Sequence, residues 1–210
     1  MIRASLTQYI EDEVIPRYAA FDAAHREDHA HSVVARALEM GERYPAIDLE
    51  MLYVAAACHD LGLAVDRKTH HLESGRIIRA DKRLRAWFSA GQIEMIAQAA
   101  EDHRASAQTP PRSLYGCLVA EADRMIEPET IIRRTVQYGM AHYPELDREG
   151  HWQRTQEHLH EKYGRGGYLH LLIPGSPNEA PLEELRRLID REDLLRPLFE
   201  KAYEESLNCF

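Results

Sequence analysis

The sequence has little of what marks a membrane protein or a disulfide-bonded protein. No uninterrupted apolar run approaches the roughly 20 residues that cross a bilayer, and the N-terminal residues contain no apolar signal-peptide core. We therefore expect a cytoplasmic protein that uses no membrane. The cysteines are few and share neither disulfide-like nor metal-like spacing, which predicts reduced thiols; they are Cys58, Cys117 and Cys209.

Positive charge is also scarce. The chain has 26 Lys and Arg residues against 35 Asp and Glu residues, for a net charge of −9. Such an acidic chain does not suit a protein that coats a nucleic-acid polymer or an anionic membrane, so any phosphate site must be a local basic cluster. The length of 210 residues allows one domain with a good core, or a domain with a smaller appendage. A monomer and a homodimer are both compatible with the sequence.

Helical periodicity accounts for most of what is present. Apolar residues recur at helical spacing through most of the chain, which predicts an all-α fold. Pro16 is expected to bend or end the first helix, and Thr69 to cap the helix that follows it. A glycine-rich turn at 163–167 leads into an apolar segment that could form a short strand or hairpin. The expected helices are residues 4–20, 29–42, 48–57, 70–78, 82–89, 92–103, 114–124, 129–142, 147–163 and, as one or two helices, 181–207.

Several histidines and aspartates fall on otherwise apolar helical faces. A buried imidazole beside a buried carboxylate is costly unless each is paired or bound to a cation. Any one of them could be a core residue with its own hydrogen bonds, but the whole set would need many independent partners or one shared ion cluster. Imidazole and carboxylate without thiolate suit Mn, Fe, Co, Ni or Zn in a hydrolytic or redox site. The residues are His29, His59, Asp60, His71, His103 and Asp123.

Their order along the chain resembles that of the HD-domain metal-dependent phosphohydrolase superfamily. The family pattern is a histidine on one helix, a His-Asp pair on the next, and an aspartate within Ala-Asp-Arg on a later helix. Helical periodicity alone cannot choose between His29 and His31, since both have apolar neighbours. The family's local form Asp-x-x-His-x-x-x-His-x-x-x-Val favours His29. The matching residues are His29, His59, Asp60 and Asp123, with Asp22, His25 and Val33 completing the local form.

The resemblance covers residues 20–126, and the segment from Phe88 to Arg124 is especially similar to the small bacterial HD hydrolases. It implies a helical bundle with a core at about 20–126 and a mostly helical C-terminal elaboration at about 127–210, which we interpret as a single domain over 1–210. The sequence around Asp123 is Glu-Ala-Asp-Arg-Met-Ile, where the small hydrolases have Asp-Ala-Asp-Arg-Leu-Asp. A relative's substrate is therefore not carried over.

The resemblance also implies the metal ligands. One divalent transition-metal ion is expected at His29, His59, Asp60 and Asp123. A second ion is allowed, with His71 and His103 completing its site, because His71-Leu-Glu-Ser-Gly is similar to the His-Pro-Glu-x-Gly element of binuclear members, although it lacks the proline. Asp60 would then bridge the two ions.

The implied activity is hydrolysis of a small phosphate ester or anhydride, such as a nucleotide, by metal-activated water. Catalytic roles fall to Asp60 as a ligand, to His25 or Asp28 in orienting the ligands, and to Arg104 as a cation near them. Each candidate phosphate-binding cation could equally be a solvated surface charge. These candidates are Arg67, Lys68 and Arg104 near the ligands, and Arg133, Arg134 and Lys162 in the basic segment 133–165. Part of this segment is predicted to close over the metal pocket, with Arg133, Arg134 or Lys162 reaching the phosphate or its leaving group.

Two other function classes stay open. The same ligand set would permit a di-iron oxygenase of the HD type, which a mixed-valence di-iron centre that consumes oxygen would reveal. The chain could also be a non-catalytic module that keeps a metal for structure or for nucleotide sensing.

Overall fold

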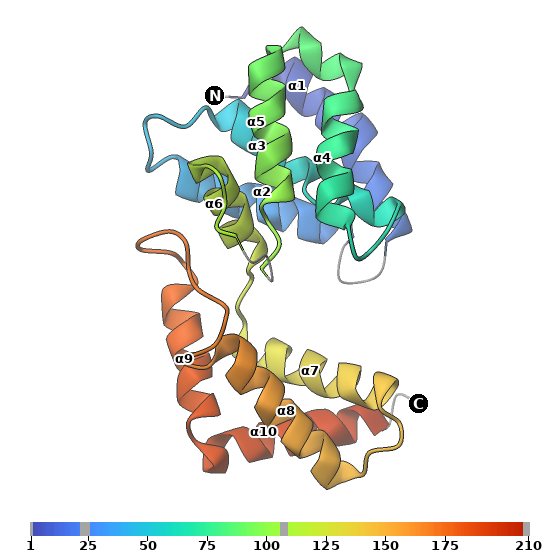
Figure 1. Cartoon of the computed structure of the whole chain (residues 1–210), viewed down its shortest axis with the longest axis vertical. Helices are drawn as coiled ribbons and strands as arrows, with labels where there is room; N and C mark the ends of the chain where they lie inside the picture. Colours follow the sequence, from blue (N-terminus) through green and yellow to red (C-terminus); the bar gives the residue numbers. More distant parts are fainter. Residues whose placement is uncertain (1, 22–25, 106–108, 208–210) are drawn as a thin grey trace. The chain divides into compact units, whose positions relative to one another are not determined.

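The structure is a computed structural model, and it describes residues 2–21, 26–105 and 109–207. Over these ranges the chain is all-α, as predicted, and contains no β-strand (Figure 1). None of the described helices is long and apolar enough to cross a bilayer. The helices are α1 (Ala4–Tyr9), η1 (Ile10–Val14), η2 (Ile15–Ala20), α2 (Glu27–Gly41), α3 (Leu49–Cys58), η3 (Leu61–Ala64), α4 (His70–Ala80), η4 (Lys82–Ala86), α5 (Ala90–Glu101), α6 (Leu114–Asp123), α7 (Pro128–His142), α8 (Arg148–Tyr163), α9 (Glu179–Ile189) and α10 (Glu192–Leu207).

The chain forms two compact units, each with its own apolar core. Unit 1 contains Met1–Arg124 and the short segment Leu172–Pro174, whereas unit 2 contains Met125–Leu171 and Gly175–Phe210. The division falls close to residue 127, where the sequence placed the start of the C-terminal elaboration. That the whole chain behaves as a single domain stays a prediction.

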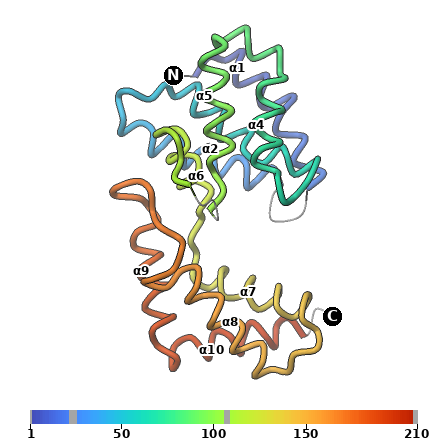
Figure 2. The backbone as a smooth tube through the Cα atoms, in the orientation of Figure 1, coloured from blue at the N-terminus to red at the C-terminus, as the bar shows by residue number. Residues whose placement is uncertain are grey.

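Unit 1 is organised around α3. From Met51 to Cys58 every residue of this helix is buried, and α3 packs against α2, α5 and α6. These three neighbours are labelled on the trace of Figure 2. The Asp48 carboxylate caps its N-terminus, because one oxygen accepts from the backbone N–H groups of Glu50 at 2.9 Å and Met51 at 3.3 Å. The helix therefore begins at a fixed point and delivers the residues after Cys58 into the middle of the unit.

The first predicted helix is interrupted. Instead of one α-helix over 4–20, the chain passes through α1, the π-helical turn η1 and the 3-10 turn η2. Pro16 lies at the start of η2, where its missing N–H cannot continue an α-helical ladder. The buried side chains still follow one another along these turns, so the apolar spacing is kept although the helix type changes.

Unit 2 packs α7, α8, α9 and α10 around Trp152, Leu159, Leu185 and Phe199. The strand or hairpin expected after residue 163 is absent from the described part of the chain, and this prediction was wrong. The N–H groups of Tyr168 and Leu169 donate to the last carbonyls of α8, on Glu161 at 3.0 Å and Lys162 at 2.9 Å. These N–H groups satisfy carbonyl groups at the C-terminal end of a helix, so they are not available to pair in a β-sheet.

Candidate metal centre

Six histidine and aspartate side chains of unit 1 are carried by helix ends. Helix ends suit such a site because a terminal side chain can extend beyond the packed helix body, where its neighbours leave room for it. The chain turns sharply at Asp60, whose φ of −107° and ψ of 6° end the helical run before η3 begins. The residues are His29 in the first turn of α2, His59 and Asp60 after α3, His70 at the start of α4, His103 after α5 and Asp123 at the end of α6.

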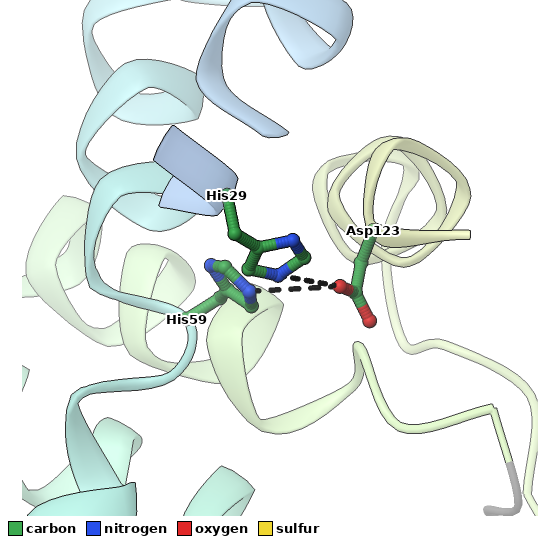
Figure 3. A group of neighbouring side chains, drawn as sticks. All are labelled: His29, His59 and Asp123. Carbon is green, nitrogen blue, oxygen red and sulfur yellow. Dashed lines mark ion pairs between the residues drawn. The ribbon is translucent and has the colours of Figure 1, made fainter. Parts of the chain in front are cut away.

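Three of these side chains form a first group. One donor atom each from His29, His59 and Asp123 lies within 4.8 Å of the other two. Asp123 Oδ1 is 3.2 Å from His29 Nε2 and 3.7 Å from His59 Nε2, and Figure 3 shows both rings pointing toward this carboxylate from different helices. Two imidazoles and one carboxylate that converge in this way match the donors that bind divalent transition metals.

A second group lies directly beside the first. It consists of Asp60, His70 and His103. Asp60 Oδ1 is 3.4 Å from the Nε2 atoms of both histidines, and these two nitrogens are 3.1 Å apart.

Asp60 connects the two groups through its two oxygens. Oδ1 faces His70 and His103, while Oδ2 lies 3.2 Å from His59 Nε2 and 3.8 Å from His29 Nε2. A carboxylate with one oxygen in each group has the arrangement of a bridging ligand between two cations. The residue Asp60 is only 3% exposed, so solvent does not compete for these oxygens.

Backbone carbonyls hold three of the imidazoles in place. The Nδ1 atoms of His59, His70 and His103 lie 2.7, 2.8 and 2.6 Å from the carbonyl oxygens of the residues three positions earlier, Ala56, Arg67 and Ala100. A carbonyl can only accept, so each Nδ1 carries the proton. In the neutral imidazole each Nε2 then keeps the lone pair that a metal requires, so a bound ion takes the place of a proton at this atom.

The electrostatics of the site favour a cation. Burial by itself would raise the pKa of the Asp60 carboxyl, but the imidazoles of His59 and His103 hold it far below its usual range. Burial would lower the pKa of His59, whereas the carboxylates of Asp60 and Asp123 raise it to about 9. The buried Nε2 of His59 makes no hydrogen bond of good geometry within the described residues. The carboxylates thus favour a positive charge at this point, and a divalent ion bound at Nε2 would supply it.

Comparison with known families identifies this part of the chain. Residues 26–126 match the family model described as the HD domain. This region is an HD domain. The predicted membership of the HD-domain metal-dependent phosphohydrolase superfamily is confirmed, and HD domains are generally metal-dependent hydrolases that bind divalent metals. No curated protein and no solved structure matches the chain.

Within the HD domain, the structure brings His70, and not its neighbour His71, into the second group. His71 belongs to neither group, and its pKa is lowered to about 4 by burial and then by the nearby His103 and His70. The sequence had placed His71 on the buried stripe with Ser74. His70 begins α4, where a side chain can reach past the helix end, so the periodicity of the helix interior did not identify it. The signal available in the sequence was the His70-His71 pair itself.

The structure also distinguishes between His29 and His31 as members of the first group. His29 enters the first group, whereas His31 Nε2 lies 2.9 Å from Glu11 Oε2 in a pair whose side chains are largely exposed. Asp28, expected to orient a ligand, is exposed, and its side chain makes no hydrogen bond or ion pair with a described residue. Asp22 and His25 lie outside the described residues.

The predicted phosphate-binding cations of unit 1 cluster around one loop. Arg67 and Lys68 are exposed in the turn before α4, and Arg104 Nη1 donates to the Lys68 carbonyl at 2.7 Å. Thr69 occupies the N-cap position, but its hydroxyl donates to Asp66 at 2.6 Å and does not cap α4 as predicted. The loop and Arg104 thus lie next to His70 and His103 in the chain, on the side of the second group.

The cations predicted in the C-terminal segment belong to unit 2. Arg134 and Lys162 line one cavity, and Arg133 lines a different one. The closure of segment 133–165 over the metal pocket therefore stays a prediction, and the three side chains do not form a single cluster.

Proposed function

We propose that the HD domain is a metal-dependent phosphohydrolase that cleaves the ester or anhydride bond of a small phosphorylated molecule. The observation that carries the proposal is Asp60, whose two oxygens face two separate histidine groups. A bound divalent ion supplies a Lewis acid for a phosphoryl oxygen and lowers the pKa of a water molecule from ~15.7 to roughly 7. With two ions in place, both the attacking and the leaving oxygen can be stabilised.

The protein side chains have distinct tasks in this proposal. His29, His59 and Asp123 would hold one ion, His70 and His103 would hold the other, and Asp60 would contribute to both. The carbonyls behind three of the imidazoles keep those rings in the ligating orientation, so little reorganisation is needed when an ion binds.

Neither cysteine that the structure describes belongs to the two groups. Cys58 is the nearest cysteine in the chain, directly before His59, and burial is the main cause that raises the pKa of its thiol to about 12. The thiol therefore stays protonated at neutral pH and behaves as a packed apolar group. The remaining ligands, nitrogen and oxygen, are those of hydrolytic Mn, Fe, Co, Ni or Zn sites.

Arg104 is the cation we assign to the substrate phosphate. Its hydrogen bond to the Lys68 carbonyl fixes the guanidinium beside the loop that precedes His70. Burial and His103 lower the pKa of His70, and the positive charge of Arg104 contributes to the same shift. This electrostatic effect on His70 supports the assignment, because a guanidinium near the second group could bind a phosphate oxygen in both ground and transition states.

The decisive experiment compares the two adjacent histidines. We expect His70→Ala to lose one of two ions per chain and at least 100-fold in phosphate release across a panel of nucleotides and sugar phosphates, because a ligand of the second ion is gone. His71→Ala is the matched control and should keep both ions. Metal content is measured by elemental analysis of the purified protein, and activity by release of inorganic phosphate.

Two outcomes would oppose the proposal. If His71→Ala loses the ion and His70→Ala keeps it, the ligand assignment is wrong. If the purified protein holds a mixed-valence di-iron centre and consumes oxygen while releasing no phosphate, the oxygenase reading replaces the hydrolase.

A further inference from the structure

Unit 2 contains a basic cavity that the metal centre does not explain. It lies between α7 and α8 and has a volume of about 540 Å³. Its lining includes the basic or ionisable side chains of Arg134, Arg154, His158 and Lys162, together with Thr135, Tyr138, Tyr143 and Tyr163. Among the described residues, no aspartate or glutamate belongs to the lining, although the chain as a whole carries a net charge of −9.

The arginines elsewhere in unit 2 show how unusual this cluster is. Most of them are neutralised by carboxylates: Arg148, Arg165, Arg186, Arg187, Arg191 and Arg196 each form an ion pair with Asp or Glu. In contrast, Arg134, Arg154 and Lys162 form no ion pair with any residue that the structure describes. Three like charges facing one cavity repel one another, and an anion bound between them would relieve that repulsion.

Arg154 is held in position before any ligand arrives. Its guanidinium lies 5.3 Å from the ring centre of Tyr138 and 4.9 Å from that of Tyr143, and Nη1 donates to the Thr135 carbonyl at 3.2 Å. Gly139 makes room for it, since a Cβ at that position would lie 3.1 Å from Nη1. A guanidinium that is already ordered loses little conformational entropy when it binds an oxyanion.

We propose that this cavity binds the phosphate group of a small organic phosphate through Arg134, Arg154 and Lys162, without a metal ion. Two guanidinium groups and an ammonium match the geometry and charge of a phosphate or diphosphate. The volume falls within the roughly 300–1,000 Å³ of small-molecule sites and exceeds what a phosphate ion alone would fill, so part of the ligand is organic. The half-buried His158 supplies one further polar contact.

The proposal does not depend on the chemistry of the metal centre, and its test keeps the two sites apart. The probe is inorganic diphosphate, titrated calorimetrically into the full-length protein after metal removal. We expect Arg134→Ala and Lys162→Ala each to weaken binding about tenfold, and Arg154→Ala more strongly, with an affinity that falls as salt concentration rises. Arg187→Ala is the matched control, because Arg187 is an exposed arginine of unit 2 that is paired with Glu184.

Arg134 keeps the test valid even if Arg154→Ala disturbs packing. Its side chain is exposed, so Arg134→Ala should leave the melting temperature unchanged and affect only the anion. His70→Ala, in unit 1, should bind diphosphate as the unaltered chain does. Binding that persists in both Arg134→Ala and Lys162→Ala, or binding that disappears in His70→Ala, would overturn the assignment, and the second result would locate the anion at the metal centre.

Discussion

Gly62 provides the sharpest test of how the second metal group is assembled. It lies in η3, the short turn between Asp60 and α4. A Cβ atom at this position would lie 1.9 Å from the carbonyl oxygen of His70 and 2.7 Å from the backbone nitrogen of Ser74. Both atoms belong to the backbone of α4, so no side-chain rotation can relieve the contact. Only glycine allows α4 to approach this closely.

The size of the effect follows from these distances. In Gly62→Ala the His70 carbonyl must move by about 1 Å or more to reach 3.0 Å, and α4 moves with it. His70 Nε2 then leaves its position 3.4 Å from Asp60 Oδ1 and 3.1 Å from His103 Nε2. A displacement of ~1 Å at a reacting site can cost about 100-fold in rate, and the overpacking itself costs about 1–3 kcal/mol of stability.

We therefore expect Gly62→Ala to lose the second ion and most of its activity while keeping the first ion. The first group should be less affected, because none of His29, His59 and Asp123 belongs to η3 or α4. Ions per chain are counted by elemental analysis, and stability is measured by urea unfolding.

Gly91→Ala is the control, since a Cβ there meets no atom within 4 Å. It lies in α5 and should gain up to about 1 kcal/mol in stability. Two ions and unaltered turnover in Gly62→Ala would refute the close approach of α4 as the device that positions His70.

Three further predictions concern the support of the site. Asp48→Ala removes the cap of α3 and should cost about 1 kcal/mol in urea unfolding with no loss of metal; unchanged stability would show that the cap is dispensable. Glu121 is fully buried, accepts from Leu172 N at 2.8 Å and lies 3.4 Å from Arg124 Nη1. Glu121→Ala should therefore destabilise the protein by about 3 kcal/mol or more, and a smaller loss would contradict this pairing. Chelation of the metal should lower the melting temperature, since an ion at 100 times its Kd stabilises by about 2.7 kcal/mol, and readdition should restore it.

Helix formation was the part of the fold most accessible from the sequence. The apolar spacing predicted nearly every helix, because the contacts between i and i+4 are local and depend on neighbouring residues alone. Helix type was less accessible: Pro16 indicated a break, yet it did not show that the chain would pass through a π turn before a 3-10 turn. The prediction of a strand after residue 163 was wrong, because N–H groups of this segment donate to carbonyls at the end of α8. The apolar character of the segment does not reveal these hydrogen bonds.

The sequence by itself determined which kinds of donors are present, and the resemblance of their order to the HD pattern singled out His29, His59, Asp60 and Asp123. Only the tertiary structure decided that His70 joins them in place of His71, and that the two oxygens of Asp60 face different groups. The reason is physical: the ligands are contributed by helices far apart in the chain, and their distances depend on how closely those helices pack. The contact between Gly62 and α4 sets one of these distances, and helical periodicity carries no information about it.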